Sequence, residues 1–152
     1  MFSFLRKNIG FFTPEEKQLI AEAVRNAEQQ TSGEIRVFVE SRCRYVDAMD
    51  RAREIFDLLK MGQTKERNAV LLYIATKDHQ LAVLGDEGIH QKVGNEYWNI
   101  EVMKMIKAFN RDNFAEGLVT CVKDIGEALQ AYFPYDSKID KNELSDDIVF
   151  GK

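Results

Sequence analysis

The sequence predicts an α/β protein, a three-layer α/β/α sandwich in which helices flank a small mixed central β-sheet. Residues 68–75 are apolar at almost every position instead of alternating, which is typical of a strand that helices cover on both faces. Segments with helical periodicity and short apolar segments follow one another along the chain, as expected of a layered α/β fold. The length of 152 residues and the hydrophobic content of 45% suit one domain with a sizeable core.

The first helix is predicted to begin after Thr13. Threonine is a favoured N-cap, Pro14 suits the first helical position, and Glu16 can complete a capping box. Apolar residues recur at helical spacing as far as the Thr-Ser-Gly break at 31–33. Residues 35–39 then alternate with a period of two, which predicts a strand.

A second helix is predicted from about Asp47, with Gly62 beyond its end, and it leads into the apolar strand. The turn at 76–80 joins this strand to a second short apolar run at 81–84. So short a turn forces the two strands to be antiparallel, and the sheet is therefore expected to be mixed.

Two further helices are predicted at 89–109, with a break near Gly94, and at 114–133. From Pro134 onward the composition is polar and acidic, which predicts an extended or disordered tail whose apolar residues 148–150 can anchor it on the domain. The expected organisation is an apolar N-terminal arm (1–11), one α/β domain (12–133) and an acidic tail (134–152).

Composition and charge exclude several classes of function. The chain has 21 basic and 25 acidic residues, a net charge of −4, and no basic stripe, so nucleic acid is not an expected partner. No run approaches the roughly 18 apolar residues of a membrane span, and Arg6 and Lys7 interrupt the N-terminal apolar segment. We therefore expect no secretory signal, no membrane span and a cytoplasmic protein. Cys43 and Cys121 lack the spacing of a thiolate metal site, and Cys121 is expected in the core.

One dense basic cluster occurs, at Ser41–Arg44. Its two arginines can meet an anion, but a solvated loop is the commoner fate of such a pair. The residues leave both interpretations open.

Signatures of catalysis are missing. The sequence has no Gly-x-x-x-x-Gly-Lys loop, no His-Glu-x-x-His helix, no Gly-x-Ser-x-Gly elbow and no Gly-x-Gly-x-x-Gly turn. Cys43 is followed six positions later by Met49 instead of the arginine of a cysteine phosphatase. Covalent phosphoryl transfer therefore has no visible nucleophile.

An acidic loop system is the remaining candidate site. Glu66 and Asn68 enter the apolar strand, and Asp86 and Glu87 follow its antiparallel partner, so the hairpin places all four at one end of the sheet. Carboxylate and carboxamide oxygens are hard ligands that suit calcium, magnesium or manganese. The simpler interpretation is that Asp86 and Glu87 only cap the helix that follows, and His90 is most simply solvent-facing.

Five segments together resemble the TPM domain family, in the right order over about residues 12–133. They are Phe12-Thr-Pro-Glu-Glu-Lys17, Thr31-Ser-Gly-Glu-Ile-Arg-Val-Phe-Val39, Arg67-Asn-Ala-Val-Leu-Leu-Tyr-Ile-Ala75, Leu84-Gly-Asp-Glu-Gly-Ile89 and Asn113-Phe-Ala-Glu-Gly-Leu118. The resemblance implies an α/β/α sandwich, an acidic cleft that takes divalent cations such as calcium, and an acid phosphatase activity known from plant members. Where the family commonly has Asp-Asn-Gly, this chain has Arg67-Asn68-Ala69, so a cation replaces a carboxylate and Glu66 is a possible substitute.

The leading hypothesis is a TPM-type binding or regulatory module with a divalent cation, calcium first and magnesium or manganese as alternatives, at Glu66, Asn68, Asp86 and Glu87. The second hypothesis is a metal-dependent phosphatase. The third is an adaptor that docks a protein partner through the N-terminal arm or the C-terminal tail.

Overall fold

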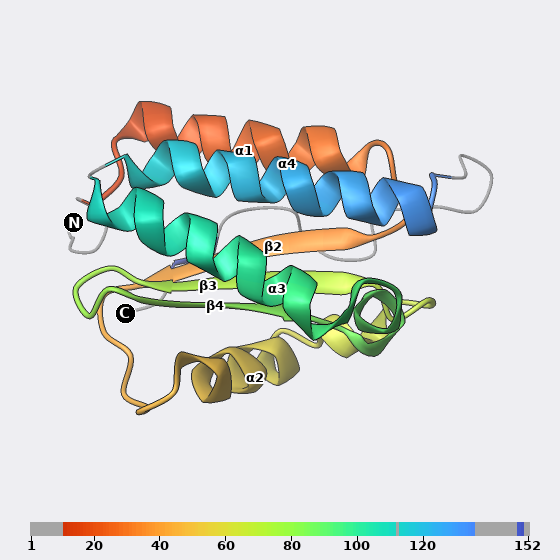
Figure 1. The fold of residues 1–152 in the computed structure, drawn as a ribbon, viewed down its shortest axis with the longest axis horizontal. Coiled ribbons are helices and arrows are strands. Elements are labelled where there is room, and N and C mark those ends of the chain that lie inside the picture. Colours follow the sequence, from red (N-terminus) through yellow and green to blue (C-terminus); the bar gives the residue numbers. More distant parts are fainter. Residues whose placement is uncertain (1–10, 112, 136–148, 151–152) are drawn as a thin grey trace.

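The computed structural model describes residues 11–111, 113–135 and 149–150. Within them the chain forms the predicted α/β/α sandwich, with a mixed sheet in the strand order β4-β3-β2-β5 (Figure 1). The elements are α1 (Pro14–Glu28), β2 (Glu34–Glu40), α2 (Ala48–Leu58), the short 3₁₀ helix η2 (Met61–Gln63), β3 (Ala69–Ala75), β4 (Gln80–Gly85), α3 (Glu87–Asn110), α4 (Phe114–Tyr132) and β5 (Val149–Phe150).

The two ends of the sheet gather different parts of the chain. Strands β2 and β3 are parallel, with Glu34 opposite Ala69 and Glu40 opposite Ala75, whereas β3 and β4 are antiparallel. One end therefore gathers the starts of β2 and β3 and the finish of β4. The other end gathers the finishes of β2 and β3, where the chain leaves towards α2 and into the β3–β4 turn.

Strand β3 is the centre of the core. All seven of its residues are buried, as its unbroken apolar sequence predicts. Val70, Leu72 and Ile74 belong to the core beneath α1, α3 and α4, and Leu71 and Tyr73 to the core beneath α2 (Figure 1). Burial of both faces of one strand stabilises the arrangement of three layers.

Strand β2 is also buried at all seven positions, although its sequence alternates between polar and apolar residues. The polar members Glu34, Arg36 and Glu40 are 4%, 6% and 4% exposed. The alternation correctly predicted a strand, but its polar positions are buried instead of facing solvent, and they share a face with Phe38, which belongs to the core beneath α2.

The helix signals in the sequence are confirmed. At the start of α1, the Glu16 amide donates to Thr13 Oγ1 at 3.0 Å and the Thr13 amide donates to Glu16 Oε1 at 2.9 Å, a complete capping box. The break predicted near Gly94 is a kink in α3, because Gly94 has φ 81° and ψ 170°. A positive φ of this size is a conformation that glycine adopts most readily.

Both termini of the chain fall largely outside the described residues. Of the predicted N-terminal arm, only Phe11 is described, and its ring packs edge-on against Phe109 and Phe114. Of the predicted tail, residues 149–150 form β5, which pairs in parallel with Phe38 and Val39 of β2. This pairing agrees with the expectation that 148–150 anchor the tail, whereas the expected extension or disorder of 136–148 lies outside the described residues.

None of the helices in the described part of the chain has the length and apolarity that crossing a bilayer requires. Cys121 is buried in the core, as its helical neighbours predicted.

Candidate functional site

The four predicted site residues lie at one end of the sheet, where β3 begins and β4 finishes. The Asp86 amide donates to the carbonyl of Ala69 at 2.9 Å, and the Gly88 amide donates to the carbonyl of Arg67 at 2.7 Å. These bonds hold the loop before β3 against the start of α3. The adjacency that the hairpin predicted is therefore present. We name this region the β3-entry edge, defined by Ser32, Glu66, Arg67, Asn68, Asp86 and Glu87.

Gly88 permits this close approach of two backbone segments. A Cβ atom at position 88 would lie 2.1 Å from the carbonyl oxygen of Glu66 and 2.7 Å from that of Arg67. Such distances are far inside van der Waals contact, so the first turn of α3 can seat against the 66–67 loop only with glycine at this position.

Arg67 makes a bidentate ion pair with Asp86. Its Nε lies 2.7 Å from Asp86 Oδ2 and its Nη2 lies 2.8 Å from Asp86 Oδ1. The Asp86 side chain is only 6% exposed, whereas that of Arg67 is 50% exposed. Glu87 is a more distant neighbour, with Oε2 3.9 Å from Arg67 Nη1. The hydrogen bonds to Asp86 raise the pKa of Arg67, so the guanidinium stays charged.

Asp86 also caps α3. Its Oδ1 accepts a hydrogen bond from the Glu87 amide at 2.8 Å, and its backbone is extended as an N-cap requires. The capping interpretation of the sequence is confirmed for Asp86. The same carboxylate also forms the ion pair with Arg67, so Asp86 has a second structural role besides capping the helix.

Glu66 and Asn68 are joined through Ser32, a residue that the sequence analysis treated only as part of a break. Ser32 Oγ donates to Glu66 Oε2 at 3.0 Å and accepts from Asn68 Nδ2 at 3.1 Å. Asn68 is 1% exposed, and its Oδ1 is buried without a hydrogen-bond partner among the described residues. A buried acceptor without a donor costs about 1–3 kcal/mol.

The oxygen atoms at the β3-entry edge are of the kinds that coordinate a hard cation. Two or three carboxylates, the Asn68 carboxamide oxygen and a hydroxyl are the ligand types that calcium and magnesium prefer. As the side chains stand, however, the described residues include no group of three or more histidine, cysteine or acidic side chains arranged to hold a metal. Both oxygens of Asp86 accept hydrogen bonds from the Arg67 guanidinium. The residues fit a cation on the condition that Arg67 releases Asp86.

His90 lies one turn into α3 and is not simply solvent-facing. Its Nδ1 accepts a hydrogen bond from Trp98 Nε1 at 3.0 Å, across the kink at Gly94. The indole of Trp98 packs directly against Gly85. A Cβ atom at position 85 would lie only 2.2 Å from the indole, so a larger residue would displace it. His90 therefore positions the kinked helix against β4.

Comparison with known proteins fits this geometry. A family model described as the TPM domain matches residues 5–128. This match spans most of the chain and includes every residue of the β3-entry edge. The chain belongs to the TPM domain family.

Solved structures agree with this membership. The BA42 protein of the psychrophilic bacterium Bizionia argentinensis is 40% identical to this TPM domain, with a TM-score of 0.83 over 93% of this chain and 96% of that one. The N-terminal domain of the cg2496 protein of Corynebacterium glutamicum is 14% identical, with a TM-score of 0.60 over 79% of this chain and 75% of that one, and so shares the fold alone. Among curated proteins, none matches the chain.

Proposed function

We propose that this TPM domain is a binding or regulatory module that takes up a divalent cation, calcium first, at Glu66, Asn68, Asp86 and Glu87. The Arg67–Asp86 pair carries the proposal. A carboxylate that is 6% exposed requires a positive partner, and here the partner is a side chain that is half exposed at the end of a flexible stem. Arg67 is thus an internal competitor for the position that a metal ion would take.

The competition is energetically feasible. The guanidinium of Arg67 is half exposed, so water can solvate it when it leaves Asp86, and water and salt screen the pair. Releasing Arg67 therefore weakens cation binding by a factor of about five at most. The expected affinity is low, near the millimolar end of the range known for calcium modules, about 10⁻⁴–10⁻³ M.

Asn68 provides further support. The carboxamide oxygen is the one buried acceptor at this edge without a donor in the described part of the chain. A hard cation, or a water bound to it, would satisfy this oxygen as a donor would. Glu66, linked to Asn68 through Ser32, adds the second charge.

The test is a titration of metal-stripped protein with calcium and with magnesium, followed by amide NMR shifts. We expect saturable shifts concentrated at residues 66–68 and 85–90. The matched variant is Asp86→Asn with Glu87→Gln, because asparagine caps a helix as well as aspartate does and both substitutions keep the shapes of the side chains. Loss of the shifts in this variant, with the fold intact, would confirm the ligands. A titration without shifts at this edge would refute the proposal.

Hydrolysis of phosphate esters, which the TPM resemblance implies, stays outside the proposal. Metal-dependent hydrolysis needs a positioned water and a group that neutralises the leaving phosphate. At the β3-entry edge the nearest cationic side chain, Arg67, is bonded to Asp86. Turnover of a generic phosphate ester that a chelator stops, and that the same double variant lacks, would overturn the non-catalytic assignment.

A role as an adaptor also stays a prediction from the sequence. The segments that would dock a partner, 1–11 and 137–152, lie almost entirely outside the described residues. Capture of a partner by the full chain, lost on removal of either segment, would test it.

A further inference from the structure

An open cavity of ≈ 640 Å³ lies at the opposite end of the sheet from the β3-entry edge. Its lining comes from the finish of β2, the loop after it and α2, and consists of Glu40, Ser41, Arg42, Arg44, Tyr45, Arg51 and Glu54. The volume falls within the range of about 300–1,000 Å³ that small-molecule sites occupy. The carboxyl ends of parallel strands are also where open α/β sheets commonly bind ligands. We name this hollow the β2-exit cavity.

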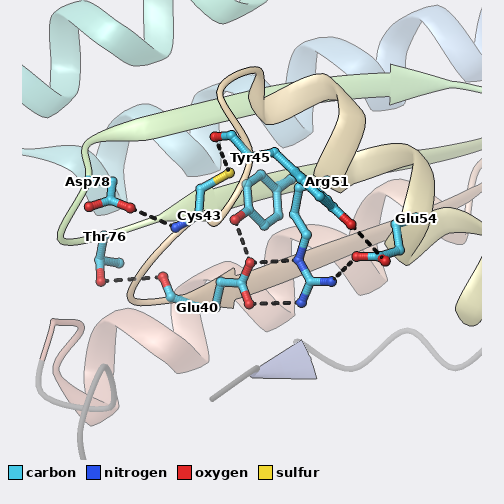
Figure 2. A network of polar contacts seen from close by, with 8 residues as sticks. Glu40, Cys43, Tyr45, Arg51, Glu54, Thr76 and Asp78 are labelled. Atoms are coloured by element: carbon cyan, nitrogen blue, oxygen red, sulfur yellow. Dashed lines mark hydrogen bonds and ion pairs between the residues drawn. The ribbon is translucent and has the colours of Figure 1, made fainter.

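A partly buried network of hydrogen bonds fixes one wall of the cavity (Figure 2). Arg51 pairs bidentately with Glu40, its Nε 2.9 Å from Oε2 and its Nη2 3.0 Å from Oε1, and it also donates to Glu54. The hydroxyl of Tyr73, a fully buried residue of β3, donates to the same Glu40 carboxylate. The guanidinium of Arg51 is therefore held in one orientation before any ligand arrives, which lowers the entropic cost of binding.

The loop that forms the opposite wall is tied to the β3–β4 turn. Asp78 accepts a hydrogen bond from the Cys43 amide at 2.7 Å and another from Arg42 Nη1 at 2.9 Å. The Cys43 amide, with a smaller effect from Arg42, lowers the pKa of Asp78. Arg44 is exposed and has no ion pair within the residues that the structure describes.

The cavity residues have more unengaged hydrogen-bond donors than acceptors, and this difference indicates which kind of ligand fits. Glu40 already accepts from Arg51 and Tyr73, and Glu54 accepts from Arg51 and from the Tyr45 hydroxyl at 2.9 Å. The two carboxylates that would otherwise favour a cation are thus occupied. Each guanidinium carries five N–H donors, and those of Arg44 and most of those of Arg42 are uncommitted. The cavity has a surplus of donors and needs a ligand rich in acceptors.

We propose that the β2-exit cavity binds the phosphate group of a small phosphorylated molecule. Guanidinium groups pair bidentately with phosphate oxygens, and Arg44 and Arg42 provide them at the rim. Arg51 on the inner wall is already paired with Glu40 and Glu54, so the positive charge for the phosphate comes from the two rim arginines. The ring of Tyr45, 39% exposed, offers a face on which a planar part of the ligand can stack. This inference does not depend on the proposed cation site, which lies at the other end of the sheet.

The experiment is an amide NMR titration of the full chain at low ionic strength with inorganic phosphate, ribose 5-phosphate and AMP, and with adenosine as the uncharged control. We expect the three phosphates to shift residues 41–45 and 51 and to leave 66–68 and 85–90 unmoved. AMP is expected to bind more tightly than ribose 5-phosphate because of Tyr45. Adenosine is expected to leave 41–45 unshifted. No shift at 41–45 with any phosphate at millimolar concentration would overturn the inference.

A matched pair of charge reversals separates a built site from general electrostatic attraction. Arg44→Glu changes a cavity residue, whereas Arg53→Glu makes the same change on the outer face of α2, where Arg53 pairs only with Asp50 in the described part of the chain. We expect the first to weaken phosphate binding about tenfold or more and the second less than about twofold. Equal losses in the two variants would show that the net charge alone attracts phosphate and would overturn the proposed site.

Discussion

The guanidinium of Arg67 binds both oxygens of the Asp86 carboxylate, at 2.7 and 2.8 Å, and so joins the residue before β3 to the N-cap of α3. In the TPM resemblance this position commonly carries an aspartate. Here the protein supplies its own positive charge where the family supplies another negative one. Both oxygens of Asp86 are therefore engaged by Arg67, and the described residues include no group of three or more acidic, histidine or cysteine side chains that could hold a metal.

Replacing Arg67 is expected to strengthen calcium binding. Arg67→Ala removes the competitor and should tighten binding up to about fivefold, whereas Arg67→Asp also adds a ligand and should tighten it about tenfold or more. Aspartate further suits the backbone, because Arg67 has φ 54°, a left-handed conformation that aspartate and asparagine adopt more readily than arginine.

Thermal unfolding with and without calcium measures this effect. Without calcium, both variants should be less stable than the natural chain, because the largely buried Asp86 loses its partner. With calcium, the melting temperature of Arg67→Asp should rise the most. A calcium response that is equal in all three proteins would argue against Arg67 as a competitor.

Gly88→Ala should destabilise the fold by about 1–3 kcal/mol through steric overlap. The added methyl group would stand 2.1 Å from the Glu66 carbonyl oxygen, and the backbone there cannot retreat without breaking the Gly88–Arg67 hydrogen bond. Gly62→Ala is the control, since a Cβ there would meet nothing nearer than 3.8 Å. Urea unfolding measures both variants. A Gly88→Ala protein as stable as the Gly62→Ala protein would contradict the close approach.

The fold follows from the sequence because its signals are local. The capping box at Thr13, the break at Gly94 and the unbroken apolar run of β3 each specify a backbone state without reference to distant residues. The hairpin extended this local reasoning to one tertiary fact, that Glu66 and Asn68 lie near Asp86 and Glu87. Hairpin geometry thus predicted this adjacency correctly, whereas the binding of a cation by these residues stays a prediction.

The sequence alone did not predict which side chains pair with one another across the fold. Arg67 was recognised as a cation near the candidate ligands, but its choice of Asp86 over Glu87 depends on the left-handed turn at 67. Ser32 was overlooked because a Thr-Ser-Gly break carries no signal that its hydroxyl will bridge Glu66 and Asn68. The sequence marked the basic cluster at Ser41–Arg44 but gave no sign of the cavity that these residues line with Glu40 and Arg51. Arg51 meets Glu40 only because α2 packs back over the end of β2, and no local pattern sets that register.

Glu40 and Glu54 bond the same guanidinium but differ in burial, which makes them a matched pair. The side chain of Glu40 is 6% exposed and that of Glu54 is 42% exposed. Glu40→Ala leaves Arg51 and the Tyr73 hydroxyl without their acceptor and should cost about 3–5 kcal/mol. Glu54→Ala should cost much less, because water replaces the lost contact. Urea unfolding of the two variants measures the difference, and similar losses would refute the central place of Glu40.

Glu101 is a buried carboxylate of α3 that faces α4. It is 2% exposed, its Oε1 has no hydrogen-bond partner among the described residues, and its Oε2 lies 3.2 Å from Lys104 Nζ. Lys104 also pairs with Asp124 of α4 at 3.0 Å. Tyr97 of α3 and Cys121 of α4 are the other titratable groups around it. Burial, only partly offset by Lys104, raises the pKa of Glu101 above its ordinary value of 4.5.

The sign of the resulting pH dependence follows from linkage. Because the folded state binds the Glu101 proton more tightly than the unfolded state, this contribution to stability is fully present below pH 4.5 and is lost as the pH rises through the raised pKa. Glu101→Gln keeps the shape and removes the titration. The stability of the variant relative to the natural chain should therefore increase with pH, at a slope of at most about 1.4 kcal/mol per pH unit.

Urea unfolding between about pH 4 and pH 8 measures this difference. Glu96→Gln, at an exposed position of the same helix, is the matched control for the substitution itself. Any loss of the Lys104 contact in Glu101→Gln shifts the whole curve of the variant but cannot produce the rising slope, because the pKa of Lys104 is raised by its bonds to Asp124 and Glu101 and the ammonium stays charged across this range. Parallel stability curves for the natural chain and Glu101→Gln would show that Glu101 stays ionised in the folded protein, held by Lys104 in spite of its burial.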